Sequence, residues 1–221
     1  MFDTLLALPL FQGLSRSDLT RILESTHLDF ETVTAENYIV QQDALCTDVT
    51  FVLEGRVESF TYAADRSWYV VETLNVPTVI GVETLYGIHR TQQRSVRALT
   101  TTRLLRVDKR TIAALTGYFE VFRINVLNLL SATIARQRQP MWQPARHSLE
   151  GRIVQFLRTH TSYPAGRKLF HISQHTLGDY LGEDYRYVSK ALHKLQRGGL
   201  IELQRTCIIV PSFEKLLQAK L

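Results

Sequence analysis

Residues 173–201 contain the pattern that most constrains how this chain can fold: two short helices joined by a tight turn. Ser173 and Asp184 are residue types that cap the first turn of a helix, so they indicate where the two helices begin. Gly182 can adopt the positive φ that ends a helix. Gly178 is small enough to let a second helix cross the first closely. The segment therefore predicts two helices that cross at a glycine.

The second helix has one apolar face, formed by Val188, Ala191, Leu192 and Leu195 at helical spacing. Its other residues are then left to face outward, and many of them are basic or aromatic. This is the layout of a helix-turn-helix, in which the second helix enters the major groove of DNA. The alternative is an ordinary helical hairpin whose charged side chains are simply solvated.

The residues that follow, 202–210, predict a short β-hairpin bounded by Gly198-Gly199 and by Pro211. Its polar centre, Gln204-Arg205-Thr206, lies between two apolar runs. A helix-turn-helix followed by such a hairpin is a winged helix, and Arg205 at its tip would lie beside a DNA phosphate. The candidate DNA-contacting residues are Ser173, His175, Tyr185, Arg186, Tyr187, Ser189, Lys190, Lys194 and Arg205.

The basic charge of the chain is concentrated in the same region. Residues 145–221 hold 12 Lys and Arg against 6 Asp and Glu, a net charge of +6. The rest of the chain has a net charge of −1, and the whole chain has +5. A polyanion such as double-stranded DNA is therefore a more natural partner for this region than a membrane.

The two cysteines, Cys46 and Cys207, are too few for a disulfide framework, an iron–sulfur cluster or a structural zinc site. We interpret both as small apolar residues in β-structure. No apolar run approaches the ~20 residues of a membrane span. Asp3 stands where a signal peptide would have basic residues. These features predict a cytoplasmic protein without a cofactor or metal site.

The first half of the chain changes pattern near residue 28. Residues 1–26 predict two short helices, with Ser15 and Asp18 at the capping positions of the second. Residues 28–108 shift to a period of two, with β-branched and aromatic residues and frequent turn signals, which predicts an antiparallel roll or barrel. The clearest predicted strands are Phe51-Val52-Leu53, Val57 to Tyr62, Trp68 to Leu74 and Arg103 to Val107.

Residues 109–139 predict a helix with two apolar stripes. One stripe is Phe119, Phe122, Val126, Leu129 and Thr133, and the other is Ile124, Leu127, Leu130 and Ile134. Because both faces must be buried, one can lie on the roll and the other on the same helix of a second subunit. The alternative is a helix buried on both faces within one chain. The predicted dimer residues are Phe122, Val126, Leu129, Leu130 and Thr133, although the two stripes can be exchanged.

This order of elements resembles the bacterial transcription regulators of the cyclic-AMP receptor protein and FNR (CRP/FNR) superfamily. Residues 9–14, Pro-Leu-Phe-Gln-Gly-Leu, are similar to the family's opening helices. Residues 38–43 are similar to an early strand and turn, with Asn37 where glycine is frequent. Residues 51–57, Phe-Val-Leu-Glu-Gly-Arg-Val, match the family's aromatic-x-Leu-x-Gly-x-Val strand and turn. Residues 185–187, Tyr-Arg-Tyr, are similar to the YeiL-type branch.

The resemblance also implies a phosphate-binding segment, from which this sequence departs. Cyclic-nucleotide binders of the family carry a Gly-Glu pair and, further on, an Arg-Ser or Arg-Thr pair. The glutamate takes the ribose hydroxyl, and the arginine pairs with the cyclic phosphate. Counted from Gly81, Val82 stands at the glutamate position, and Gln92 and Gln93 stand at the Arg-Ser positions. The resemblance therefore implies a roll that does not bind cyclic AMP.

Two charged residues lie close to these positions in sequence. Glu83 and Arg94 are each one or two places out of register, so a locally shifted loop would restore the pair. Without that shift, the pocket lacks the partner of its anion. The candidate effector-pocket residues are Gly81, Val82, Glu83, Gln92, Gln93 and Arg94.

The sequence thus predicts an α+β fold: an N-terminal antiparallel β-roll of the cyclic-nucleotide-binding, jelly-roll-like type, a long dimerisation helix and a C-terminal winged helix-turn-helix. The expected boundaries are 1–108 for the roll, 109–139 for the helix, 140–146 for a hinge at Pro140 and Pro144, and 147–221 for the winged helix.

The predicted function is that of a homodimeric, sequence-specific transcription regulator. Its partners would be a palindromic double-stranded operator and, as the resemblance implies, RNA polymerase. The alternative is a non-catalytic cyclic-nucleotide or small-molecule sensor module that acts through a protein partner. An enzyme is not predicted, because the sequence has no GxxxxGK[ST], HExxH or GxSxG motif.

Overall fold

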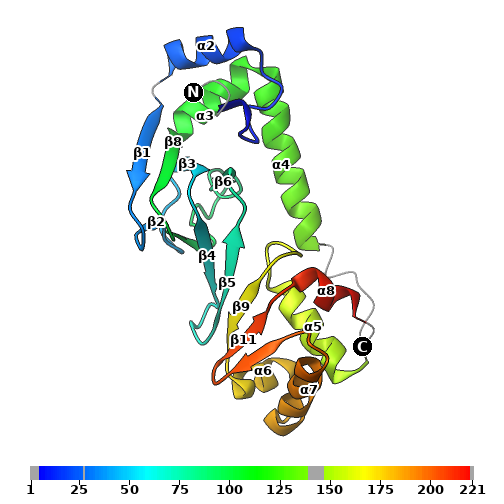
Figure 1. Ribbon diagram of the computed structural model, residues 1–221. Helices are drawn as coiled ribbons and strands as arrows, with labels where there is room; N and C mark the ends of the chain where they lie inside the picture. Colours follow the sequence, from blue (N-terminus) through cyan, green and yellow to red (C-terminus); the bar gives the residue numbers. More distant parts are fainter. Residues whose placement is uncertain (1–4, 27, 139–146, 220–221) are drawn as a thin grey trace. The chain divides into compact units, whose positions relative to one another are not determined.

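Figure 1 shows the computed structural model, which describes residues 5–26, 28–138 and 147–219. Packing divides the chain into two units, and each is described by itself. Unit 1 comprises Met1–Glu58 and Leu74–Ala135, and unit 2 comprises Ser59–Thr73 and Arg136–Leu221. Residues 59–73 therefore pack with the C-terminal third, whereas the sequence placed them in the roll. The predicted hinge at Pro140 and Pro144 lies outside the described residues.

Unit 1 begins with helical turns and one regular helix. Helix α2, Arg16–Ser25, starts at the predicted capping box, where the Ser15 side chain accepts from the Asp18 N–H and Asp18 accepts from the Ser15 N–H. Reciprocal bonds of this kind satisfy N–H groups that a helix end leaves without partners. The capping interpretation of Ser15 and Asp18 is confirmed.

The strands of unit 1 pair antiparallel, as the period-two pattern predicts. One sheet has the order β1-β8-β3-β6, and in addition β2 pairs with β7. The bounds are β1 Asp29–Val33, β2 Tyr38–Val40, β3 Asp48–Glu54, β6 Thr78–Ile80, β7 Ser95–Ala98 and β8 Thr102–Asp108. Strand β3 is buried over most of its length, and Phe51 lies in the core of unit 1.

The predicted long helix is two helices. Helix α3, Lys109–Tyr118, is capped by Asp108, and helix α4 runs over Glu120–Arg138. Between them, Phe119 leaves the helical conformation, with φ −117° and ψ 106°. Its side chain is buried in the core of unit 1. The break lets the apolar ring point into that core, and the single helix over 109–139 was therefore a wrong prediction.

Two of the predicted dimer residues of α4 lie in the core of unit 1. Phe122 and Val126 are 0% and 9% exposed and belong to the core of unit 1, where the Phe122 ring lies 5.3 Å from that of Phe11. They fill the core and are not available to a second subunit, so their assignment to a dimer interface was wrong. Leu129 and Leu130 are half-buried against the same core, and Thr133 donates to the Leu129 carbonyl.

The other stripe of α4 faces away from this core. Ile124, Leu127 and Ile134 are 46%, 56% and 55% exposed in the single chain. Their spacing of three and seven residues is that of the a and d positions of a heptad, with Ser131 at the remaining position. We call Ile124, Leu127, Ser131 and Ile134 the exposed stripe of α4.

Within the residues that the structure describes, unit 2 combines the hairpin of β4 and β5 with three helices, a three-stranded wing sheet and a last short helix. Its sheet has the order β10-β11-β9-β5, with β9 pairing antiparallel with both neighbours. The bounds are β4 Val57–Tyr62, β5 Tyr69–Leu74, α5 Leu149–Thr159, β9 Lys168–His171, α6 Gln174–Leu181, α7 Tyr185–Arg197, β10 Glu202–Gln204, β11 Cys207–Val210 and α8 Phe213–Gln218. The predicted helices and wing are confirmed.

The two cysteines are both free and buried, and Cys207 lies in β11. Within the described residues, no helix combines the length and the apolar character that a membrane span requires.

Candidate nucleic-acid interface

The turn between α6 and α7 is built by the residues that the sequence indicated. The Ser173 hydroxyl accepts a hydrogen bond from the Thr176 N–H at 3.0 Å, which caps α6. Gly182 ends α6 in the left-handed conformation, with φ +64°. The Asp184 carboxylate accepts from the Arg186 N–H at 2.8 Å and caps α7. These contacts satisfy the helix ends and set the position at which α7 begins.

The close approach of the two helices depends on Gly178. A Cβ at this position would lie 2.7 Å from the Glu183 carbonyl oxygen, a distance that real Cβ atoms essentially never show. The neighbouring atom belongs to the backbone of the turn, so it cannot move aside as a flexible side chain would. Gly178 therefore sets how closely α6 and the turn before α7 pack.

Gly178→Ala should destabilise unit 2 by about 1–3 kcal/mol, because overpacking forces the backbone apart. The measurement is thermal unfolding followed by circular dichroism. Gly198→Ala is the matched control, since a Cβ there meets its nearest atom, the Leu195 carbonyl oxygen, at an ordinary 3.4 Å. Equal unfolding temperatures for the two variants would contradict the role assigned to Gly178.

Helix α7 is held by α5 and by the core of unit 2. Its predicted buried face is confirmed: Val188, Ala191, Leu192 and Leu195 all lie in that core. Arg152 of α5 forms an ion pair of 2.6 Å with Glu183 and donates to the Leu181 carbonyl, so one guanidinium holds both sides of the turn. Such a fork of two hydrogen bonds is the geometry that arginine favours. The turn that precedes α7 is thus braced from α5.

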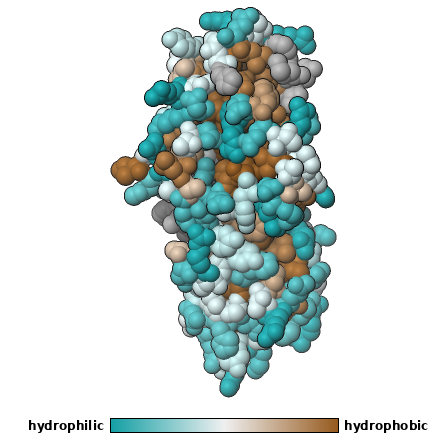
Figure 2. All heavy atoms as spheres, turned by 90° about the vertical axis from the view of Figure 1, so that its left-hand side faces the viewer, coloured by the Kyte–Doolittle hydropathy of each residue, from teal (hydrophilic) through white to brown (hydrophobic). Residues whose placement is uncertain are grey.

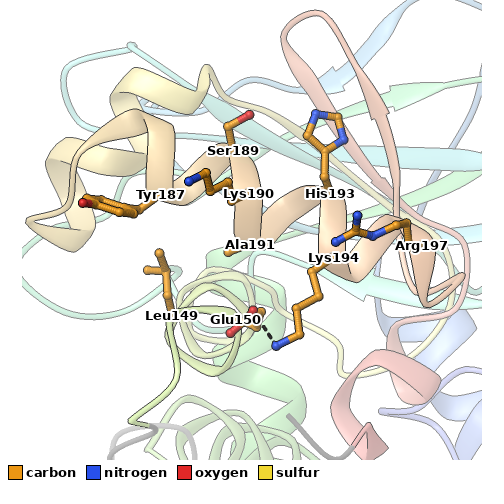
Figure 3. A pocket seen from close by; sticks show the side chains of 9 residues that line it. All are labelled: Leu149, Glu150, Tyr187, Ser189, Lys190, Ala191, His193, Lys194 and Arg197. Carbon is orange, nitrogen blue, oxygen red and sulfur yellow. Dashed lines mark ion pairs between the residues drawn. The ribbon is translucent and has the colours of Figure 1, made fainter.

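The opposite face of α7 is polar and basic. Figure 2 shows a mostly hydrophilic surface at the end of unit 2 that carries α6 and α7 in Figure 1. An open groove of about 430 Å³ runs along this face and the start of α5. Figure 3 shows the side chains that line it. The groove is lined by Leu149, Glu150, Tyr187, Ser189, Lys190, Ala191, His193, Lys194 and Arg197. Four cationic or imidazole side chains therefore follow one another along the second half of α7.

One of these cations has a partner within the unit. The Lys194 Nζ lies 2.9 Å from a Glu150 carboxylate oxygen, as the dashed line in Figure 3 marks. The hydrogen bond from Lys194 lowers the pKa of the Glu150 carboxyl. Because Lys194 is 66% exposed, this pair is weak and can open when a phosphate approaches.

The start of α7 carries a small aromatic cluster. The rings of His175, in α6, and Tyr185 stack with centroids 4.1 Å apart. The guanidinium of Arg186 lies 5.9 Å from the centroid of the Tyr185 ring, and Lys190 lies at the same distance from Tyr187. The stack orders Tyr185 at the first turn of α7, while Arg186 and Lys190 remain exposed.

The wing is a tight hairpin. β10 and β11 pair through Gln204 and Cys207, which leaves Arg205 and Thr206 as its two-residue turn. Arg205 is exposed at the tip, where the sequence placed it.

Sequence families match the two parts of the chain in series. The model of a cyclic nucleotide-binding domain matches residues 30–117, and that of a Crp-like helix-turn-helix domain matches residues 151–219. These are the two domains of the CRP/FNR transcription regulators, in the order in which those proteins carry them. The chain belongs to the CRP/FNR family.

Solved structures agree with this family at the level of the fold. A protein from Eubacterium rectale, described as a transcriptional regulator of the CRP/FNR family, is 20% identical with a TM-score of 0.52, over 95% of this chain and 96% of its own. The sensor domain of the transcriptional regulator DNR from Pseudomonas aeruginosa is 17% identical with a TM-score of 0.51, over 66% of this chain and 95% of its own. No curated protein matches the sequence.

For this CRP/FNR regulator, sequence reasoning missed part of the groove. His193 and Arg197 extend the outer face of α7 beyond Lys190, and Leu149 and Glu150 come from α5. The first two continue the helical spacing that begins at Arg186, so the same periodicity would have found them. The contribution of α5 depends on tertiary packing and has no local sequence signal.

In unit 1, the candidate effector residues do not all gather as the unshifted register implies. Val82 is buried in the core of the unit, and Gln92 is also buried. Glu83 and Arg94 do meet, with 3.6 Å between their nearest nitrogen and oxygen atoms. Gly81 has φ +92°, which allows this close loop, and Gln93 donates to the Thr91 carbonyl. The loop therefore pairs the two charged residues that lie out of register.

No group of three or more His, Cys, Asp and Glu side chains suited to a metal ion occurs in the ranges that the structure describes.

Proposed function

We propose that this protein is a homodimeric, sequence-specific DNA-binding regulator that inserts α7 into the major groove of a two-fold operator. One observation carries the proposal: α7 is buried on one face and braced at its start, and it carries basic and aromatic side chains on its other face. A helix held in this way presents side chains to base edges in a fixed register.

The proposed contacts fall into two classes. Tyr185, Arg186 and Lys190, at the start of α7, would read base edges, while Arg205 on the wing would contact phosphate. Arg197 and His193 extend the phosphate contacts along the groove. The remaining proposed contacts are Ser173, His175, Tyr187, Ser189 and Lys194.

Dimerisation belongs to the same proposal, because a two-fold operator needs two recognition helices about one DNA turn apart, ~34 Å. The exposed stripe of α4 is the interface that the structure supports, since the other apolar stripe already fills the core of unit 1. Its heptad spacing suits a parallel pair of helices related by a two-fold axis.

We also propose that the roll does not use cyclic AMP as its effector. Arg94, whose side chain is 13% exposed, already has the Glu83 carboxylate beside it. A cyclic phosphate would have to displace this carboxylate, and Val82 packs in the core at the position of the family's ribose-binding glutamate. The effector, if the roll takes one, differs in chemistry from a cyclic nucleotide.

Calorimetric titration of the purified protein with cyclic AMP at physiological concentrations should therefore give no heat of binding. Micromolar affinity would contradict the proposal and would show that Glu83 and Arg94 serve the ribose and the phosphate from their shifted positions. Arg94→Gln would then abolish that binding.

RNA polymerase is the further partner that we propose, because a family regulator bound near a promoter acts on the polymerase. A cytoplasmic location follows from the proposed access to the chromosome. The likeness of residues 185–187 to the YeiL-type branch stays a hypothesis.

Selection of genomic fragments by the purified protein, with and without small molecules from a cell extract, tests the proposed function. We expect fragments that share a two-fold motif, and a change in their enrichment when the effector is present. Enrichment of no fragment under either condition, together with capture of a protein partner, would favour the sensor module that acts through protein contacts.

A further inference from the structure

A segment that the family model assigns to the cyclic nucleotide-binding domain packs as part of unit 2. The family model of the cyclic nucleotide-binding domain matches residues 30–117, but in the structure residues 59–73 pack in the same unit as the winged helix. Strand β5 pairs antiparallel with β9, with Tyr69 opposite His171 and Glu72 opposite Lys168. Figure 1 shows β5 beside β9 at the edge of the wing sheet. The hairpin of β4 and β5 thus extends that sheet beyond β9.

The pairing contains a fully buried ion pair. The Glu72 and Lys168 side chains are each 1% exposed, and 2.9 Å separates the carboxylate oxygen from the Nζ. The same carboxylate accepts from the Ser162 N–H at 3.0 Å and from the Tyr163 N–H at 3.2 Å. Unit 2 therefore holds a receptor for one carboxylate, made of an ammonium group and two successive backbone amides.

Contacts between aromatic rings fix the position of the strand that carries this carboxylate. Trp68, the residue before β5, is buried in the core of unit 2, where its ring lies 5.3 Å from Phe156 and 4.9 Å from His160. The rings of Tyr69 and His171 stack at 4.4 Å with an angle of 9° between their planes. The indole, the stacked rings and the ion pair act at positions 68, 69 and 72, in or next to one strand, so a shift in register would break all of them.

Of the contacts between β5 and β9, the ion pair of Glu72 and Lys168 is the most sensitive to substitution. An ammonium group in a dry site is costly unless a carboxylate pairs with it, and the remaining donors must also be satisfied. Removing the Glu72 charge leaves Lys168 buried without its counter-ion. Release of the hairpin would restore water to both groups, so loss of this charge favours undocking.

We propose that Glu72 is a positioning residue for DNA binding, because it fixes the winged helix to a hairpin whose two ends continue into unit 1 at Glu58 and Leu74. This inference rests on the proposed function. It assigns to residues 59–73 a role in DNA binding without any contact to DNA.

The physical reason is pre-organisation. Two winged helices must engage one operator at a fixed spacing, and every degree of freedom that the complex removes lowers the affinity. Packing of the winged helix on the hairpin removes such degrees of freedom before DNA binds. A dimer with the hairpin undocked would still carry intact recognition helices, but its two-fold binding would be weaker and its binding to a half-site unchanged.

The test compares DNA affinity of full-length variants on a two-fold site and on a single half-site. Glu72→Gln keeps the shape of the side chain and removes its charge, and it should weaken two-fold binding by about tenfold. The control is Glu58→Gln, which breaks the 2.6 Å ion pair with Arg97 at the base of the same hairpin. Lys168→Met is the second variant, and it should weaken two-fold binding less, because Glu72 keeps its two backbone donors.

A disulfide provides the rescue that a merely structural role would not show. Tyr69→Cys with His171→Cys places two thiols opposite each other on adjacent strands, a separation that a disulfide can bridge. Added to Glu72→Gln, the oxidised disulfide should restore two-fold affinity, and reduction should abolish it again. The native cysteines are both buried.

The inference is overturned if Glu72→Gln, folded by circular dichroism, binds the two-fold site as tightly as wild type. It is equally overturned if its affinity stays low after oxidation, or if the half-site weakens to the same extent. Failure of the proposed function looks different, since the wild-type protein itself would then bind no DNA site.

Discussion

Leu127→Glu should convert the protein from a dimer into a monomer that no longer binds a two-fold site tightly. Leu127 lies at the centre of the exposed stripe of α4 and is 56% exposed in the single chain. In a parallel helix pair, the two Leu127 side chains face each other across the two-fold axis. A glutamate there would bury two like charges, at a cost of several kcal/mol per ion.

The measurement is sizing with light scattering, followed by titration of the variant onto a two-fold site and a half-site. Ala132→Glu is the matched control, because Ala132 is exposed on the same helix but lies outside the heptad positions of the stripe. We expect the control to remain a dimer. A wild-type protein that is monomeric at tens of micromolar and still binds a two-fold site tightly would place the interface elsewhere.

Val126→Glu should have a different effect from Leu127→Glu, although the two residues are adjacent in sequence. Val126 is buried in the core of unit 1, so Val126→Glu would destabilise that unit before it affected association. Circular dichroism separates the two outcomes, since Leu127→Glu should keep the folded signal of the wild type.

The burial of Phe122 and Val126 in the core of unit 1 shows the limit of periodicity as evidence. Helical spacing identifies two apolar faces but not the surface that covers each of them. Phe122 meets the ring of Phe11, which lies more than a hundred residues away in sequence, and only the tertiary structure brings the two together. Likewise, Phe119 breaks the helix because its ring enters the same core, and no proline or glycine at that position marks the break.

The helix-turn-helix could be predicted in detail because its signals are local. Ser173, Gly182 and Asp184 act on backbone groups within a few residues of themselves, and their roles follow from residue type alone. The docking of Glu72 on Lys168 has no such signal, since a lysine and a glutamate almost a hundred residues apart are ordinary surface residues until both are found buried.

The effector region could be predicted from the sequence only in part. The sequence placed Glu83 and Arg94 close to the family's positions and left open whether a shifted loop would pair them. The structure brings the two side chains within 3.6 Å of each other, where they form an ion pair between themselves. Their placement at the family's ribose and phosphate positions stays a prediction. The burial of Val82 and Gln92 depends on how the loop closes on the core, which the spacing alone does not determine.

Arg186→Ala should weaken operator binding by about 1–3 kcal/mol and relax specificity at one base pair. Arg186 is exposed in the first turn of α7, and its own N–H, which Asp184 caps, is unaffected by loss of the side chain. In the family, an Arg-Glu-x-x-x-Arg arrangement begins this helix, and its glutamate accepts from cytosine N4. Here Tyr185, Arg186 and Lys190 occupy these places.

An arginine in place of the glutamate reverses the direction of the hydrogen bond. A guanidinium donates to O6 and N7 of guanine, so the preferred base pair at this position should be inverted relative to the family's usual half-site. Selection from a randomised operator library, repeated with Arg186→Ala, measures both the preference and its loss.

Arg205→Ala is the contrasting variant, because the wing tip is proposed to contact phosphate. It should weaken binding to all sequences alike and reduce the slope of affinity against salt by about one. A wild-type motif identical to the usual family palindrome, or uniform weakening by Arg186→Ala across the library, would show that Arg186 contacts the backbone and that another side chain of α7 reads the base.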